Sequence, residues 1–281
     1  MQRYCRLHRR LRCGLALVAA LGLTSPPAAA DPVTIAYRLF LHEAAFGSAT
    51  LTAESDGARY TLTVIARFGD TGVQGWAAGQ VGRGGLAPSV FTAEIVRGEK
   101  KRRIGFGFKQ GTADRPVIDP PLPPGDAPPP LLADRHLRGV IDPVSALVLP
   151  AAPLGYAQLS ACGRTQRVFD GLNRFDVVLF PSRSETIVVN REPLLTFACR
   201  MRWTPAADRA FFGIREMRGL VWFAPVLDGT LLVPVRAELD TPRGKVLLEA
   251  YDLAPFRILR PASWQRHRLS LNNPHATVEV P

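Results

Sequence analysis

Residues 168–180 read VFDGLNRFDVVLF, and this stretch sets the fold class of the chain. The pair Asp170-Gly171 stands between two runs of β-prone residues, and glycine accepts the positive φ that a tight hairpin turn requires. We expect separate strands at residues 167–170, 174–180 and 184–190. The stretch lies between Cys162 and Cys199, the only two cysteines after residue 30. It therefore predicts a hairpin and a following strand, tied back to a sheet by a disulfide.

Residues 1–30 have the composition of a secretory signal peptide. Five arginines make a basic start, residues 14–24 form an apolar run, and alanines occupy positions 28–30. The apolar run is shorter than the roughly 20 residues that span a bilayer as a helix. We predict cleavage after residue 30 and export to the periplasm or the medium, with no transmembrane span after processing. A membrane-anchoring helix is the alternative.

Export to an oxidising compartment has a consequence for the cysteines. Cys5 and Cys13 leave with the signal peptide, so Cys162 and Cys199 remain as a pair that we expect to join. The bridge closes a loop of 36 intervening residues, which is worth about 4 kcal/mol on a chain-entropy model. Two cysteines this far apart do not supply enough ligands for a metal, and we predict no metal and no cofactor.

The charge of the mature chain argues against one class of partner. Removal of residues 1–30 lowers the formal net charge from +11 to +6, because this segment carries five positive charges and no negative ones. Basic residues are scattered apart from a cluster at residues 97–103, so we expect no nucleic-acid binding. A moderately basic surface can favour anionic lipid headgroups or polyanionic glycans. An ordinary soluble surface explains the same composition.

Most of the mature chain alternates apolar and polar residues, as strands with one buried face do. The clearest runs are at residues 33–41, 60–66, 103–108, 231–239 and 245–253. Turn signals such as Asp56-Gly57 and Asp228-Gly229 separate them. A sheet of about a dozen antiparallel strands must curl or close to protect its edges. We therefore expect an all-β fold, a strongly curved antiparallel sheet or incomplete barrel, as a single domain over residues 31–253.

Several segments depart from this alternation. Residues 68–85 hold seven glycines, which predicts irregular strands and a short helical turn near residues 73–77. A proline-rich loop over residues 111–135 is excluded as a central strand or helix, and Pro234 predicts an edge or a bulge. Asp142-Pro143 caps the one short helix that we expect, although Asp142 as a catalytic acid is the alternative. Residues 254–281 are expected to form a polar C-terminal tail.

Four short motifs mark the second half of the chain. They are VFDG with RFD at residues 168–176, IDPVSAL at 141–147, CRMRW at 199–203, and WFAP with VPVR at 222–225 and 233–236. On these motifs, the chain resembles a bacterial secreted family known as domain of unknown function 3108, over about residues 37–253. The family has no assigned activity, so the resemblance implies location and architecture only. Phe175 stands where the family usually has tyrosine, which removes one hydroxyl.

The sequence gives little support for catalysis. It contains no zinc-protease motif, no nucleophile elbow and no phosphate-binding glycine loop before a helix. Asp170 and Asp176 could form a glycosidase carboxylate pair. A turn role for Asp170 and an arginine partner across the strands for Asp176 explain the same residues. We predict that the protein is not an enzyme and has no catalytic residues.

Three tryptophans are the candidate ligand-lining residues. Trp76, Trp203 and Trp222 could line a cavity, because curved sheets often hold apolar ligands on their concave side. Core packing is the alternative for all three. Our leading hypothesis is a non-enzymatic binding or carrier protein of the cell envelope, for a lipid or another apolar small molecule. The alternatives are a structural protein that presents its sheet edge or proline-rich loop to an envelope protein, and a glycan hydrolase.

Overall fold

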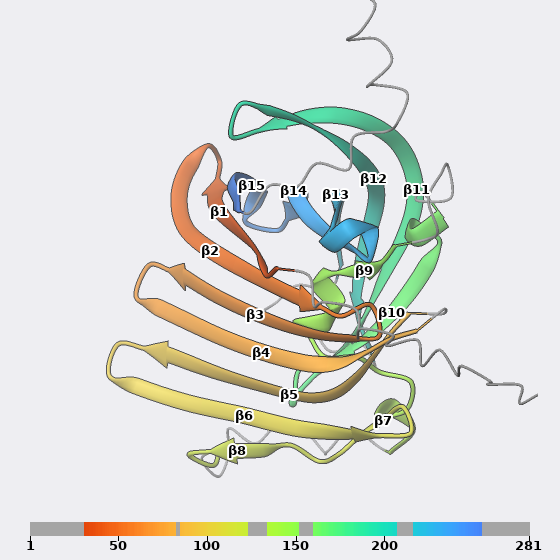
Figure 1. Ribbon diagram of the computed structural model, residues 1–281. Coiled ribbons are helices and arrows are strands. Elements are labelled where there is room, and N and C mark those ends of the chain that lie inside the picture. The colour runs from red at the N-terminus through yellow and green to blue at the C-terminus, as the bar shows by residue number, and fades with distance from the viewer. Residues whose placement is uncertain (1–30, 83–84, 123–133, 152–159, 207–215, 255–281) are drawn as a thin grey trace, which may run out of the picture.

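The computed structural model describes residues 31–82, 85–122, 134–151, 160–206 and 216–254 (Figure 1). The predicted signal peptide and the C-terminal tail beyond residue 254 lie outside these ranges. The described residues form an antiparallel sheet of 15 strands that bends into a nearly closed, barrel-like shape. This arrangement confirms the predicted fold class. No helix in these ranges is long and apolar enough to cross a membrane.

The strands are long and follow one another closely, with short turns between most of them. In chain order they are β1 (Val33–Leu41), β2 (Ala44–Ser55), β3 (Arg59–Phe68), β4 (Thr71–Gly82), β5 (Gly85–Arg97), β6 (Lys100–Lys109), β7 (Thr112–Ala113), β8 (Val117–Asp119), β9 (Leu149–Pro150), β10 (Arg164–Phe169), β11 (Arg174–Val189), β12 (Glu192–Pro205), β13 (Met217–Val226), β14 (Leu231–Thr241) and β15 (Gly244–Ala254). The helical segments that the structure describes include 3₁₀ turns at Asp134–His136, Ser145–Leu147 and Leu227–Gly229.

The two ends of the sheet are brought together by one connecting segment. The strand order runs from β10 to β15 and continues from β1 to β7. Residues 137–141 pass between these edges. The Ala113 amide of β7 donates to the Leu137 carbonyl (2.9 Å), and the Ile141 amide donates to the Arg167 carbonyl of β10 (2.8 Å). The segment thus occupies part of both edges, which would otherwise present unpaired backbone groups.

Register shifts interrupt several of the strand pairs. β11 continues through a shift between Pro181 and Arg183 as one strand of 16 residues, where the sequence predicts two strands. A second shift lies between Trp222 and Phe223, opposite Pro234. The predicted bulge is therefore confirmed, although β14 is an interior strand and not an edge. Bulges add local bend and twist to a strand pair.

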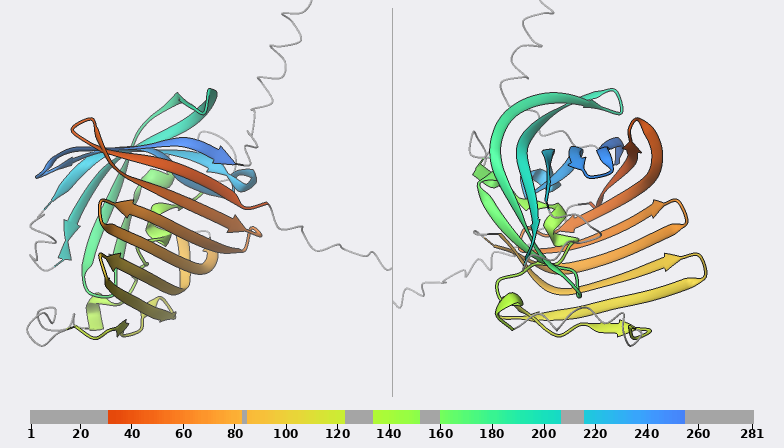
Figure 2. Two further views of the ribbon diagram at one scale, coloured as in Figure 1. Left: turned by 90° about the vertical axis from the view of Figure 1, so that its left-hand side faces the viewer. Right: turned by 180° about the vertical axis from the view of Figure 1, so that it is seen from behind.

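The long β11–β12 hairpin arches over β13, β14 and β15, as Figures 1 and 2 show. At its tip, the Asn190 side-chain amide donates to the Asp252 carboxylate of β15 (3.3 Å). Val189 and Leu194, beside the tip, are buried in the main core cluster together with Leu253. The tip of the arch therefore packs into the main core at this end of the sheet.

The glycine-rich segment has the predicted irregularity, a register shift against β5 between Ala78 and Gly79, but it lacks the predicted helical turn. β4 runs without a break through residues 73–77, where the pattern predicts a helical turn. A Cβ at Gly75 would lie 2.8 Å from Val144 Cγ2, and a Cβ at Gly79 would lie 2.8 Å from the Tyr60 hydroxyl. Glycine at these two positions therefore lets residues 142–149 and Tyr60 approach the buried face of β4 closely.

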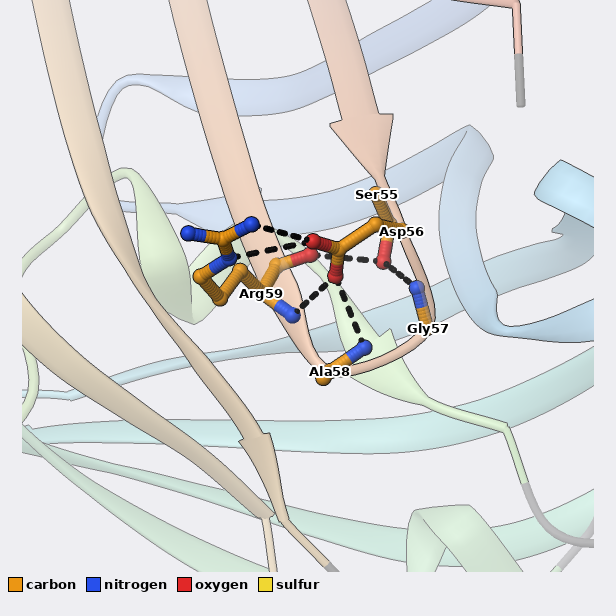
Figure 3. A network of polar contacts seen from close by, with 5 residues as sticks. All are labelled: Ser55, Asp56, Gly57, Ala58 and Arg59. Carbon is orange, nitrogen blue, oxygen red and sulfur yellow. Dashed lines mark hydrogen bonds and ion pairs between the residues drawn. The ribbon is translucent and has the colours of Figure 1, made fainter. Parts of the chain in front are cut away.

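The turn between β2 and β3 is the hairpin turn that Asp56-Gly57 predicts (Figure 3). One carboxylate oxygen of Asp56 accepts hydrogen bonds from the amides of Ala58 (3.0 Å) and Arg59 (2.6 Å). The other oxygen accepts a bond from Arg59 Nε (3.0 Å). Gly57 has a φ of 87°. The bonds from Arg59 and Ala58 hold the pKa of Asp56 below its usual value.

Part of the proline-rich segment belongs to the sheet. β8 pairs with residues 103–105 of β6, and β7 pairs with residues 108–109 of the same strand. Proline is tolerated at such edges because the missing amide faces away from the ladder. Residues 123–133 lie outside the described ranges. At the positions described, the predicted loop covers the edge of β6.

Candidate functional site

The disulfide between Cys162 and Cys199 is present, with the two Cα atoms 5.5 Å apart. The predicted pairing is thus confirmed. Cys199 lies on the same face of β12 as Met201 and Trp203, and these side chains are buried in a second apolar cluster. The bridge therefore fixes the short segment around Cys162 against this face of β12.

The structure does not bring the three tryptophans together. Trp76 is 36% exposed on the solvent face of β4. Trp203 is buried beside the disulfide, and its ring centroid lies 5.4 Å from that of Phe175. Trp222 is buried in the main core cluster, where its indole N–H donates to the Glu185 carboxylate. The guanidinium of Arg236 lies 5.5 Å from the Trp222 ring centroid.

A buried hydrogen-bond chain joins the turn at residues 142–147 to β3. Asp142 accepts hydrogen bonds from the amides of Val144 (2.9 Å) and Ser145 (2.8 Å) and from the Ser145 hydroxyl (2.6 Å). The Tyr60 hydroxyl lies 2.7 Å from Ser145 Oγ and donates to it, because the serine proton is directed at Asp142. Asp142 and Ser145 are both 0% exposed. The capping role predicted for Asp142 is confirmed.

Burial sets the acidity of this chain of hydroxyl and carboxyl groups. It raises the pKa of Asp142 to about 6, and it raises the pKa of Tyr60 above the usual tyrosine value. A general acid must come within hydrogen-bond reach of the substrate. Asp142 has no exposed surface, so a substrate on the surface would not contact it. Its hydrogen bonds to Val144 and Ser145 stabilise the turn inside the bent sheet.

The two carboxylates of the β10–β11 hairpin are engaged locally. Asp170 accepts hydrogen bonds from the amides of Leu172 (2.7 Å) and Asn173 (2.6 Å), and burial raises its pKa. Asp176 forms an ion pair with the Arg174 guanidinium (2.5 Å). Its arginine partner thus lies on the same strand, not across the strands as the sequence analysis predicts. The turn role predicted for Asp170 is confirmed.

A groove of about 1030 Å³ opens where β1 ends and β15 begins. Cross-strand register places one residue from each of six strands in a first row. This row consists of Phe180, Arg200, Leu220, Glu238, Leu247 and Phe40. A second row, beside the first, consists of Arg202, Arg218, Asp240 and Lys245. All ten residues line the groove, which we call the cationic groove.

The two rows differ in chemistry. Four of the six residues in the first row are apolar, so this row offers an apolar floor. Three of the four residues in the second row are cations. Glu238, on the floor, is paired with Arg236 (2.8 Å), which does not line the groove, and Arg218 is paired with Glu216 (2.9 Å). Arg200, Arg202 and Lys245 have no ion-pair partner within 4.0 Å among the described residues.

This arrangement places cations beside an apolar surface. His42 lies at the rim, where its Nε2 is 2.9 Å from the Arg243 carbonyl oxygen. The part of the chain that the structure describes holds no group of three or more metal-ligating side chains. Cations beside an apolar floor suit a ligand with an acidic head and an apolar body.

Local sequence patterns do not predict the groove, because its residues come from six strands. One local signal was available. Arg200 and Arg202 alternate with Cys199, Met201 and Trp203, so β12 must bury its odd-numbered side chains and direct its arginines to the other face. Arg218 and Lys245 lie beside these arginines in the groove only because of the strand register, which the local sequence does not show.

The fold and the groove define a bent β-sheet protein with an open, cation-lined groove. The sequence matches no family model and no curated protein. A protein of Parabacteroides distasonis, provisionally described as a lipoprotein, is similar at a TM-score of 0.33 and 7% identity, over 81% of this chain and 96% of that chain. A hypothetical protein of Chlamydia trachomatis is similar at a TM-score of 0.22 and 11% identity, over 81% and 92% of the two chains. Both scores are low, and neither similarity indicates a function.

Proposed function

We propose that the protein is a non-enzymatic carrier or binding protein of the cell envelope, and that it binds an amphipathic anion such as an acidic lipid in the cationic groove. One observation carries the proposal. The register sets a mainly apolar row across six strands directly beside a row of three cations and one carboxylate. The apolar body would lie over Leu220 and Leu247, and the acidic head would contact Arg202 and Lys245.

The size and chemistry of the groove agree with such a ligand. Its volume of about 1030 Å³ lies at the upper end of the usual range for small-molecule sites, about 300–1,000 Å³. Burial of apolar surface contributes roughly 25 cal/mol per Å². A hydrogen bond to a charged partner adds about 1.5–3 kcal/mol. A ligand with an apolar body and a single acidic head would gain binding free energy from both apolar burial and charged hydrogen bonds.

The envelope location is supported by features outside the groove. Residues 1–30 have the composition of a signal peptide. The Cys162–Cys199 bridge is a feature of proteins that fold in oxidising compartments. The resemblance to domain of unknown function 3108 agrees with export and is part of the same proposal.

The test begins with the protein purified from the periplasm of its own host. Native mass spectrometry, followed by lipid extraction, should detect a bound acidic amphiphile. Titration with decyl sulfate and with a neutral decyl polyethylene glycol ether, each below its micelle-forming concentration, should show tighter binding of the anionic compound. A protein that emerges empty, and that binds neither compound or both equally well, contradicts the proposal.

Charge reversal in the groove locates the binding site. Arg202→Glu and Lys245→Glu should each weaken binding of decyl sulfate about tenfold, which corresponds to about 1.4 kcal/mol. Arg115→Glu is the matched control, because this exposed arginine precedes β8 and lies outside the groove lining. If the control weakens binding as much as the groove variants do, only net charge matters and the groove is not the site.

A second candidate function is favoured by one feature of the β11–β12 hairpin. Val188 is 69% exposed and Leu195 is 45% exposed, and the register places both on the same face of the hairpin. An exposed apolar patch of this kind can be a docking surface for another protein. Val188→Asp should abolish such docking in pull-down experiments from envelope extracts and leave decyl sulfate binding unchanged.

A further inference from the structure

The solvent face of β4, β5, β6 and β8 carries a second groove, of about 430 Å³. The register aligns four residues across this face, in the order Trp76, Thr92, Gly105 and Val117. Trp76 is 36% exposed and Val117 is 75% exposed. A flat indole and a branched side chain thus stand at the two ends of the row, with smaller residues between them. We call these four residues the outer platform.

Gly105 leaves a recess at the middle of the outer platform. A Cβ at this position would meet Thr92 Cγ2 at 3.5 Å and the Phe91 carbonyl oxygen at 3.6 Å, which are ordinary contacts. The φ of Gly105 lies outside the left-handed region. Neither packing nor backbone conformation therefore requires glycine here. The missing side chain opens space between the indole of Trp76 and Val117.

A row of polar side chains borders the outer platform on the same face. It consists of Gln74, Glu94, Arg103 and Asp119. Glu94 is held by Arg103 (3.0 Å) and by Lys101 (2.7 Å), and these bonds keep its pKa below the usual value. Two cations and two carboxylates balance one another, so the border offers donors and acceptors with no net charge. A neutral ligand with many hydroxyl groups fits this border better than an ion does.

We propose that the outer platform binds a neutral carbohydrate, with one pyranose ring stacked on the indole of Trp76 above Gly105. The C–H hydrogens on one face of a pyranose are partially positive, and the face of an aromatic ring is negative. The hydroxyl groups project sideways, where each can donate and accept hydrogen bonds with the polar border. An acyl chain in the same place would bury those polar groups without partners, at a cost in free energy. The proposal is independent of the cationic groove, which lies on other strands.

The test is calorimetric titration of the intact exported protein with cellotriose, maltotriose and triacetylchitotriose. At least one of these neutral trisaccharides should bind. Trp76→Ala should raise its Kd at least tenfold, because the stacking surface is lost. Gly105→Val should do the same by filling the recess. The added Cβ meets only ordinary contacts, so this variant should remain folded, which thermal unfolding checks.

Matched controls separate the outer platform from the rest of the surface. Gly72 lies on the same face of β4, and a Cβ there meets nothing within 4 Å, so Gly72→Val should bind the sugar as the wild type does. Tyr251→Ala removes another aromatic residue, 45% exposed, and should also have no effect. Arg202→Glu should weaken decyl sulfate binding alone. The proposal is overturned if no trisaccharide binds at millimolar concentration, or if binding survives both Trp76→Ala and Gly105→Val.

Discussion

The concave surfaces of the two halves of the sheet are covered by different elements. β1 to β6 are joined by tight turns, and their buried face packs against the turn at residues 142–149, with Tyr60 hydrogen-bonded to Ser145. Among β10 to β15, the long β11–β12 hairpin arches over its neighbours (Figure 2). The first half is thus held by a segment that fills its curve. The second half is held by the arch and the disulfide.

This difference shows where a binding site can form in a bent sheet. The filled half has its binding features on the solvent face, where Trp76 and Gly105 lie. The arched half keeps an open groove at one end, because the long hairpin covers β13–β15 only in part. If this comparison is right, variants of the filled half should change stability and leave groove binding intact.

The largest expected effect concerns the disulfide of the arched half. Replacement of both Cys162 and Cys199 by serine should lower the free energy of unfolding by about 4 kcal/mol, because the closed loop no longer restricts the unfolded chain. Denaturant unfolding of wild type and variant measures this difference. Decyl sulfate binding should also weaken, since β12 supplies two groove arginines. A change below 1 kcal/mol would mean that the arch is held by its apolar core alone.

The next effect concerns the close approach at β4. Gly79→Ala should cost about 3 kcal/mol, because the new Cβ would overlap the Ala87 carbonyl oxygen and lie 2.7 Å from Pro88 Cα. Gly72→Ala is the control on the same strand, where a Cβ has open space. Thermal unfolding compares the two. Decyl sulfate binding by folded Gly79→Ala should equal that of the wild type, and a loss of binding would show that the two halves are coupled.

The buried carboxyl group of Asp142 gives the filled half a pH dependence. Its pKa is about 6 in the folded protein, above the usual value, so its contribution to stability is present below about pH 4 and is lost as the pH rises through 6. Relative to Asp142→Asn, the wild type should lose about 2 kcal/mol of unfolding free energy between about pH 4 and about pH 7.5.

Denaturant unfolding of both proteins at the two pH values tests this sign. The other carboxyl groups, including Asp56 and Glu94 with their lowered pKa values, cancel in the difference between the two proteins. If the wild type gains stability relative to Asp142→Asn as the pH rises, the folded protein lowers the pKa of Asp142. The hydrogen bonds from Ser145 and the backbone amides would then outweigh the effect of burial.

The sequence predicts those features that depend on local geometry. Alternation predicts β1, β3 and β14, and Asp56-Gly57 predicts its turn, because each depends on neighbouring residues alone. The disulfide is also predictable, since the two cysteines that remain after the predicted signal peptide have one possible intramolecular pairing. The proposed capping role of Asp142 follows in the same way.

The remaining features depend on contacts between distant residues. Tyr60 and Ser145 are 85 positions apart, and nothing near either one indicates the other. The glycines of β4 obscure its apolar–polar alternation, although Gly75 leaves space for Val144 and Gly79 leaves space for Tyr60. The cationic groove depends on the register of six strands, and each bulge shifts that register by one residue. Local sequence patterns do not determine the combined register of six strands.

The smallest expected effect concerns the tip of the arch. Asn190→Gly removes the hydrogen bond to Asp252 (3.3 Å) and keeps a residue that accepts the positive φ of 49° at this turn. Because the bond is exposed, its loss should cost only about 0.5 kcal/mol. Val189→Ala, at the buried side chain beside it, should cost about 2 kcal/mol. Hydrogen exchange should show faster opening of the hairpin tip in the first variant, with the turn at Asp56 unchanged. If the glycine variant costs as much as the alanine variant, the tip contact and not the buried core holds the arch over the sheet.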